Sequence, residues 1–387
     1  MNEASEHEQD YPLPRLWYIV QRTSRCKPHD KQGVFMRRLP LAVFLVLAIS
    51  CAALNGLAQH DASPGPYKIL KKIKIGGDGG FDYITADVEN RRLYVPRNGP
   101  MGQVTVFNLD TLEPEGTIPN VRSGGIAVDP KSHHGFSTTR PMTMWDTNTL
   151  QVIKMIDVEG RPDGIMFDPY NEHVWVLSHM PPYATVIDGK DGTIVGTVDL
   201  GGQPEQAASD GKGTVYVNIL DKGNIAVVDA KSLAVTKHID LSSKGVMNGS
   251  GLSLDAKNHI LFSYWRVPTP VVVVVNAETG NIITTFPTAA GVDTVAFNPA
   301  TKEALSTASE GSIIVIKENT PTSFEVEQRL PTMPGARTMV LDTKTNHVVT
   351  MAFEYGPLPA DAPPPVPGRL PLGPPVPGSF TLLMIGR

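Results

Sequence analysis

The chain has 387 residues, 41% of them hydrophobic and 19% charged, which is enough for one large domain or two ordinary ones. Its only cysteines, Cys26 and Cys51, lie near the N-terminus, so the remainder has no disulfide framework and no thiolate chemistry. Residues 1–58 carry seven Lys/Arg and five Asp/Glu; without them the formal charge changes from −5 to −7. This acidic balance, without a basic run, disfavours generic nucleic-acid binding.

The N-terminal region predicts export. Two arginines after Met36 precede a short apolar run at residues 39–47, and small residues follow up to Ala58. This pattern indicates a signal peptide at residues 36–58, cleaved near Ala58/Gln59, and a periplasmic or secreted protein. The run is shorter than the about 20 residues of a membrane span, so we expect no transmembrane domain in the mature chain. A retained anchor is the alternative.

Two further features belong to this region. Residues 1–35 are polar and irregular, and we interpret them as a mis-assigned start or a disordered tail, with a cytoplasmic tail as the alternative. Cys51 follows small residues, as in a lipidation motif. The leucine expected three positions earlier is replaced by Ala48, which disfavours lipidation.

An internal repeat organises the rest of the chain. A short apolar strand ends in Asp or Asn, a turn follows, and three more strand-like runs complete each unit. The first Asp/Asn marker recurs seven times, at Asp87, Asp129, Asp168, Asp210, Asp255, Asn298 and Asp342. The spacing of 39–45 residues is typical of four-stranded blades, so the sequence predicts an all-β, seven-bladed β-propeller over residues 67–387. A β-sandwich would not explain equal periods.

The third and last units show how the strands are read. In the third, residues 164–167, 173–176, 184–187 and 194–198 are β-branched or aromatic runs bounded by turn residues. The last unit offers only three strands, so we expect residues 67–75 to supply its fourth and close the ring. It also contains a proline-rich insertion at residues 356–378, which must run outside the sheet as an ordered flap or a mobile loop.

Several short sequence segments resemble those of a known repeat family. Residues 93–98 and 215–218 resemble the tetrad of the YVTN-repeat propellers, and residues 80–83, 291–293 and 335–339 agree. The chain is therefore similar to the periplasmic YncE-like group of that family. The resemblance implies the propeller fold and secretion, and it implies no shared reaction.

Equivalent repeat positions predict a charged ring at the mouth of the central channel. Five residues before each marker stand Asp82, Gly124, Asp163, Glu205, Ser250, Asp293 and Arg337. Four carboxylates could bind a divalent cation such as Ca²⁺, a cationic small molecule, or act in acid–base chemistry. For a metal we expect two adjacent acids plus water, because a wide channel separates opposite blades. Alternatively each acid caps a turn or pairs with a neighbour, with Arg337 held by Asp293 or Asp82.

The loops between the second and third strands should emerge on the same face. Eleven residues after each marker stand Asn98, Arg140, His179, Asp221, Arg266, Ser309 and Phe353, with Arg97 and Trp265 beside them. Charge, aromatic surface and the insertion together favour a ligand site on this face, although scattered surface charges would give the same pattern. His133, His134, His173, His259 and His347 should be solvated turn residues on the opposite face.

Three classes of function follow from these patterns. The leading hypothesis is a binding or interaction protein that uses the channel mouth for a small-molecule ligand, a metal ion or a protein partner. A metal-assisted hydrolase or lactonase is the alternative. Single-stranded nucleic-acid binding through Trp265 and nearby arginines is a third, which the negative charge opposes. The chain has no local Ser-His-Asp signature, phosphate loop or redox motif, so the sequence favours binding over catalysis.

Overall fold

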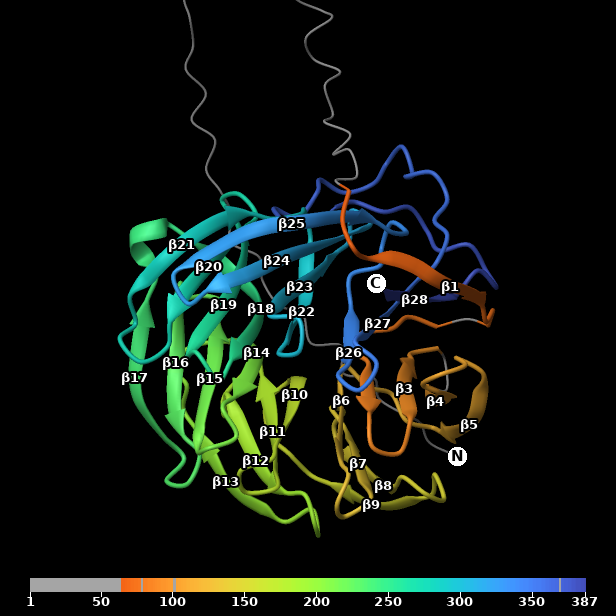
Figure 1. The fold of residues 1–387 in the computed structure, drawn as a ribbon. Coiled ribbons are helices and arrows are strands. Elements are labelled where there is room, and N and C mark those ends of the chain that lie inside the picture. Colours follow the sequence, from red (N-terminus) through yellow and green to blue (C-terminus); the bar gives the residue numbers. More distant parts are fainter. Residues whose placement is uncertain (1–63, 78, 100–101, 369) are drawn as a thin grey trace, which may run out of the picture. The chain divides into compact units, whose positions relative to one another are not determined.

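The computed structural model describes residues 64–77, 79–99, 102–368 and 370–387. These form seven four-stranded antiparallel sheets arranged in a ring, which confirms the predicted seven-bladed β-propeller (Figure 1). The residues of the predicted signal peptide and of the preceding segment lie outside the described part of the chain.

Each blade is one sheet, and in blades 1 to 6 the strands follow chain order from the channel to the outside. Blade 1 consists of β2 (Thr85–Asp87), β3 (Arg92–Arg97), β4 (Gln103–Asn108) and β5 (Pro114–Pro119). Blade 2 consists of β6 (Ile126–Asp129), β7 (His134–Ser137), β8 (Met142–Asp146) and β9 (Val152–Ile156). Blade 3 consists of β10 (Pro162–Asp168), β11 (His173–Ser178), β12 (Ala184–Asp188) and β13 (Ile194–Val198).

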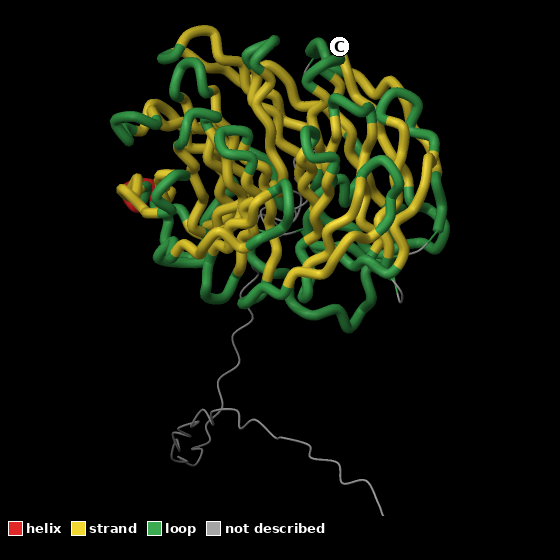
Figure 2. Tube along the Cα trace, turned by 90° about the horizontal axis from the view of Figure 1, so that it is seen from below, coloured by secondary structure: helices red, strands yellow, loops and turns green. Residues whose placement is uncertain are grey.

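Blades 4 to 6 repeat this plan with longer strands. Blade 4 consists of β14 (Pro204–Ser209), β15 (Thr214–Ile219), β16 (Asn224–Asp229) and β17 (Ala234–Asp240). Blade 5 consists of β18 (Met247–Asp255), β19 (Ile260–Val267), β20 (Val271–Asn276) and β21 (Ile282–Pro287). Blade 6 consists of β22 (Val292–Asn298), β23 (Glu303–Ala308), β24 (Ser312–Thr320) and β25 (Ser323–Pro331). A 3₁₀ turn, Ser242–Lys244, is the only helical segment among the described residues (Figure 2). No helix in this part of the chain is long and apolar enough to cross a membrane.

Blade 7 joins the two ends of the propeller. It consists of β26 (Met339–Asp342), β27 (His347–Ala352), β28 (Thr381–Gly386) and, as its outermost strand, β1 (Lys68–Lys74). The β1 strand runs antiparallel to β28, with Lys68 opposite Gly386 and Lys74 opposite Thr381 (Figure 1). The prediction that the N-terminal segment completes the last blade is therefore confirmed.

The core lies between blades. Each of the seven hydrophobic clusters is built from two adjacent blades, so every sheet buries both of its faces. The largest buried side chains include Trp145, Trp175 and Trp265. Burying such side chains contributes about 1.5–3 kcal/mol each, which stabilises the ring against separation of its blades.

The repeat markers have a structural cause. Each Asp or Asn accepts a hydrogen bond from a backbone N–H two or three residues later, as Asp129 does from Lys131 at 3.0 Å and Asp342 from Lys344 at 3.0 Å. The same bond occurs at Asp87, Asp168, Asp210, Asp255 and Asn298. An Asx turn of this kind closes the link between the first two strands of a blade.

The proline-rich insertion leaves blade 7 between β27 and β28 and adds no strand to it, as predicted. Its base is closed by backbone bonds from Gly356 N to Pro374 O at 2.9 Å and from Val376 N to Glu354 O at 2.8 Å. Farther along, Gly368 packs against the backbone of Arg266 in blade 5. The insertion therefore spans part of the channel mouth.

Candidate functional site

Irregularities in the innermost strands orient the side chains of the residues that were predicted to form the charged ring. Strands β10, β14, β18 and β22 each pair regularly with their neighbour except for one register shift. Asp163, Glu205, Ser250 and Asp293 all lie inside these shifts. A β-bulge rotates a side chain away from the regular alternation of the strand, which turns these residues toward the channel mouth.

A cavity of about 450 Å³ lies at this mouth. All four predicted carboxylates line it, together with His179, Arg266 and Arg337, which were also predicted from the sequence. Further lining residues are Tyr83, Leu220, Gly291, Ser309 and Tyr355, and from the insertion Leu370, Leu372 and Gly373. The cavity is of the size and character of a small-molecule site.

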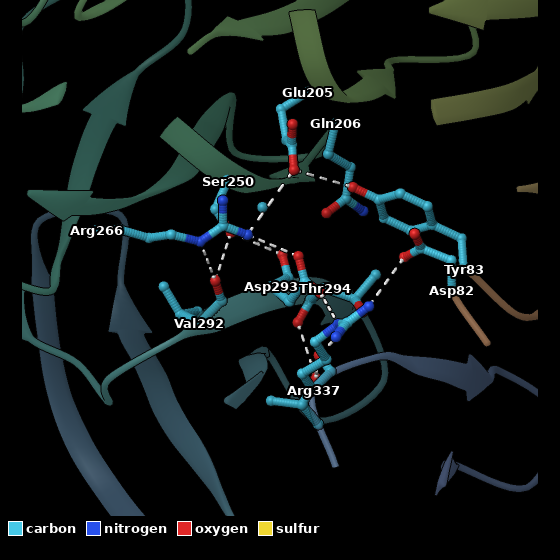
Figure 3. A network of polar contacts seen from close by, with 12 residues as sticks. Asp82, Tyr83, Glu205, Gln206, Ser250, Arg266, Val292, Asp293, Thr294 and Arg337 are labelled. Atoms are coloured by element: carbon cyan, nitrogen blue, oxygen red, sulfur yellow. Dashed lines mark hydrogen bonds and ion pairs between the residues drawn. The ribbon is translucent and has the colours of Figure 1, made fainter. Parts of the chain in front are cut away.

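Asp293 joins the two arginines on one wall (Figure 3). Its carboxylate accepts a bond from Arg266 Nη2 at 2.7 Å and forms an ion pair with Arg337 Nε at 2.8 Å. Asp82 Oδ1 lies 3.8 Å from Arg337 Nη2. The alternative interpretation of the sequence, in which Arg337 is held by Asp293 or Asp82, thus describes the contacts of Arg337, and Asp293 acts as a bridge between the guanidinium groups of blades 5 and 7.

A cluster of metal-ligand type adjoins this wall, and its Glu205 Oε1 lies 3.8 Å from Arg266 Nη2. His179 Nε2 lies 3.2 Å from Glu205 Oε2 and 3.3 Å from Asp163 Oδ2. One ligand atom from each of these three residues lies within 4.8 Å of the other two. In a tetrahedral site with metal–ligand distances of ~2.1 Å, neighbouring donor atoms are ~3.4 Å apart, so the two histidine distances fit such an ion.

Arg161 bears on the protonation of His179. Its Nη2 lies 2.6 Å from His179 Nδ1, and a guanidinium can only donate. In this arrangement Nδ1 accepts, and Nε2 carries the proton and donates to Glu205. A metal-bound Nε2 would place the proton on Nδ1, so binding requires the exposed Arg161 side chain to turn away.

Burial, together with neighbouring negative charge, raises the pKa values of carboxyl groups in the site. Burial and the charge of Asp293 raise the pKa of Asp82 to about 8. Burial and Glu205 raise the pKa of Asp163, and the bond to Glu205 raises that of His179. Four carboxylates in a partly desolvated cavity are more charge than two guanidiniums balance, so protons or a cation are needed there.

Side chains from facing blades close the floor of the cavity. Tyr83 of blade 1 extends its hydroxyl to Glu205 Oε1 of blade 4, 3.4 Å away (Figure 3). Gln206 of blade 4 donates to the carbonyl of Val295 in blade 6 at 3.2 Å. Below this level the channel wall is mostly apolar, with residues such as Met166, Leu177 and Phe297. The polar cavity therefore has a side-chain floor and a roof formed by the insertion.

Three residues predicted for this site lie elsewhere. Trp265 is fully buried between blades 4 and 5, where its Nε1 donates to Ser263 Oγ at 2.8 Å, so the proposed stacking surface is wrong. Arg97 is also buried, with its guanidinium 3.8 Å from the centre of the Phe380 ring. Arg140 is exposed, bonds to the carbonyl of Gly160 and does not line the cavity.

Other lining residues were not foreseen. Tyr83 follows Asp82 directly, and counting in the repeat singled out only the carboxylate. The roof residues Leu370 and Leu372 lie in the insertion, which has no counterpart in the other blades. Ser309 was among the loop positions considered but was given no role, and its hydroxyl has no hydrogen-bond partner within the described chain.

Comparison with known proteins supports the fold alone. No family model matches the chain, and no curated protein matches it. Among solved structures 1583 chains are similar, a number too large for the fold to indicate one function. A chain of Kuenenia stuttgartiensis hydrazine synthase is 15% identical with a TM-score of 0.60, over 76% of this chain and 95% of that one. A chain of the mitotic checkpoint complex is 11% identical with a TM-score of 0.60, over 83% and 95%.

Both similar chains support the propeller fold. The protein is a seven-bladed β-propeller with a charged cavity at its channel mouth, and at these identities the comparisons go no further.

Proposed function

We propose that the protein is an exported ligand-binding propeller whose channel mouth holds a divalent cation through Asp163, His179 and Glu205. The observation that carries this proposal is the convergence of the three donors. Both distances from His179 Nε2 to the carboxylate oxygens are close to the separation of neighbouring ligand atoms in a tetrahedral site. The excess of carboxylates supports it, because a bound cation would supply the missing positive charge. Export is supported by the signal-peptide pattern of residues 36–58.

The donor set favours a transition metal over the calcium expected from the sequence. Ca²⁺ takes six to eight oxygen ligands, whereas this cluster offers one imidazole nitrogen and two carboxylates. Zn²⁺ binds both donor types in a four-coordinate site. Mn²⁺ accepts carboxylates as well and is the second ion to test.

The test compares two histidines that each face a carboxylate. His179→Gln removes the nitrogen donor of the cluster, while His259→Gln alters an exposed pair with Glu278, 3.7 Å apart, in a turn. Zinc content is measured by elemental analysis and affinity by calorimetry. We expect about one zinc per wild-type and His259→Gln chain, and loss in His179→Gln. A free ion at 100 times its dissociation constant adds about 2.7 kcal/mol to stability. The proposal is wrong if zinc neither binds nor stabilises the wild type.

Metal-assisted hydrolysis is the second candidate function. Three protein ligands are the number found in catalytic zinc sites, where a water molecule takes the fourth position. Here the donors line a cavity that could admit a substrate carbonyl. A panel of lactones should then show turnover that a chelator removes and zinc restores. Zinc binding without any turnover would leave the binding role alone.

A further inference from the structure

The wall beside the cation ligands carries two arginines that can form further hydrogen bonds. Arg266 is 3% exposed and lines the cavity. Its Nε donates to the carbonyl of Val292 at 2.8 Å and its Nη2 pairs with Asp293, yet its Nη1 has no partner among the described residues (Figure 3). A buried donor left unpaired costs about 1–3 kcal/mol, so a ligand acceptor there would recover free energy.

A second unpaired polar group lies in the same cavity. Ser309 is 7% exposed, lines the cavity, and its hydroxyl lacks a partner in the described chain. A Cβ on Gly291, whose φ is +72°, would lie 1.8 Å from this hydroxyl. A side chain at position 291 would have to displace the Ser309 hydroxyl, so the glycine leaves room for that hydroxyl in its present position.

Arg337 completes this wall. It holds Asp293 through Nε, but its side chain is 39% exposed, so part of its guanidinium remains available. Both arginines share the carboxylate of Asp293, and their second carboxylate contacts are longer, at 3.8 Å from Arg337 Nη2 to Asp82 and 3.8 Å from Arg266 Nη2 to Glu205. An anion placed beside Arg337 and Arg266 would meet fixed donors, which is the arrangement that recognises carboxylates.

The charge balance makes the binding of such an anion depend on the presence of the cation. Four carboxylates face two guanidiniums in the cavity, which gives a net charge of −2 when all are ionised and His179 is neutral, and of −1 while Asp82 keeps its proton. An anion is then repelled. A bound divalent cation brings the same groups to zero or above, and an anion is no longer opposed by the field of the site.

The roof adds an apolar surface. Leu370 and Leu372 of the insertion and Leu220 of blade 4 line the same cavity as the arginines. A ligand held by its charge at the arginine wall would bury an attached hydrocarbon part against these leucines, with ~0.8 kcal/mol for each buried methylene.

We propose that, once the cation is bound, the channel mouth takes a small organic carboxylate, paired with Arg337 and the free Nη1 of Arg266, whose hydrocarbon part lies against the leucines of the roof. This inference rests on the proposed cation site. It defines the ligand as a carboxylate with an attached hydrocarbon part, and it predicts ordered binding in which the cation binds first.

The experiment titrates butyrate, its uncharged analogue butyramide, acetate and inorganic phosphate into the full protein by calorimetry. Each titration is done with zinc-loaded and metal-free protein. We expect zinc-loaded wild type to bind butyrate at least tenfold more tightly than acetate, butyramide or phosphate. The metal-free protein should bind butyrate at least tenfold more weakly, and butyrate should in turn tighten zinc binding by the same factor.

Three variants test where the carboxylate binds. Arg337→Met should weaken butyrate binding at least tenfold while zinc binding persists, and its fold is safeguarded because Asp293 keeps Arg266. Lys222→Met removes one charge from an exposed residue near the cavity and should bind butyrate as the wild type does. Arg337→Lys keeps the charge and should fall between the two.

The outcomes separate the two proposals. If zinc does not bind, the proposed function fails. If zinc binds but butyrate does not, or binds Arg337→Met and wild type equally, only the carboxylate inference is overturned. A preference for phosphate over butyrate would also overturn it, since the apolar roof would then play no part.

Discussion

The partly buried carboxyl of Asp82 should make the stability of the protein fall as pH rises. Its pKa is about 8 in the folded protein and ~3.9 in an unfolded chain. Between these values the folded state holds a proton that the unfolded state has lost. The free energy of unfolding then decreases with pH, by at most ~1.4 kcal/mol per pH unit, until Asp82 is ionised in both states.

The size of the effect follows from the exposure of the side chain. Undiminished, the difference between the two pKa values would amount to ~5–6 kcal/mol between pH 4 and pH 8. The Asp82 side chain is 31% exposed, so solvent screens part of this, and we expect a loss of about 3 kcal/mol. Asp82→Asn removes the titrating proton and should be more stable than the wild type at pH 8 by about this amount.

Urea unfolding at pH 5, 6.5 and 8, without metal, measures the difference. The Asp82→Asn profile should be flatter than that of the wild type, with a residual slope from Asp163, whose pKa is also raised. Asp157→Asn, which alters an exposed carboxylate outside the cavity, should follow the wild type. If wild type and Asp82→Asn lose stability in parallel from pH 5 to 8, Asp82 is ionised throughout and the charge argument for the site is refuted.

Three shorter predictions test other parts of the structure. Arg161→Ala should tighten zinc binding about tenfold in calorimetry, because Nδ1 of His179 is then free to carry the proton. Tyr67→Phe should lower the urea-derived unfolding free energy by about 1–3 kcal/mol, since buried Glu303 loses a donor at 2.5 Å. Gly291→Ala should lower it by about 2 kcal/mol or more, because the positive φ and the collision with Ser309 Oγ both oppose a side chain.

Matched variants separate these effects from general destabilisation. Tyr170→Phe changes a tyrosine that is 43% exposed and should leave stability unchanged. Gly378→Ala introduces a side chain at φ +68° with no atom within 4 Å, so it should show only the backbone cost of ~1 kcal/mol. Equal losses for Gly291→Ala and Gly378→Ala would exclude the collision as a cause. Unchanged zinc affinity in Arg161→Ala would contradict the assigned tautomer.

The fold was predictable because its information is local and repeated. Every blade needs an Asx turn after its first strand, and the side chain that makes it, such as Asp129, is visible in the sequence as a periodic marker. The ring of carboxylates was predictable for the same reason, since equal register places equivalent residues at equal height. The bulges that aim Asp163 and Glu205 leave no local signal that was recognised.

The failures arise where blades differ from one another. Counting eleven residues from the marker assumes strands of equal length, but β19 runs to Val267, so Trp265 still belongs to the strand and faces the core. The pairing of His179 with Glu205 depends on the approach of blades 3 and 4, which no single repeat encodes, whereas Asp163 lies in the same blade as His179. The roof comes from an insertion unique to blade 7, so repeat register offers no guide to where Leu370 lies.

The strand that closes the ring has a consequence for biogenesis. Because β1 is made first and its partner β28 last, the final blade cannot form until nearly the whole chain has left the ribosome. Contacts between such distant segments are slow to form, and an unpaired strand invites association with other chains meanwhile. Four of the seven residues of β1 are lysines, at positions 68, 71, 72 and 74. Their mutual repulsion would keep waiting copies of this strand apart, so the segment that completes the propeller also protects the unfinished chain from aggregation.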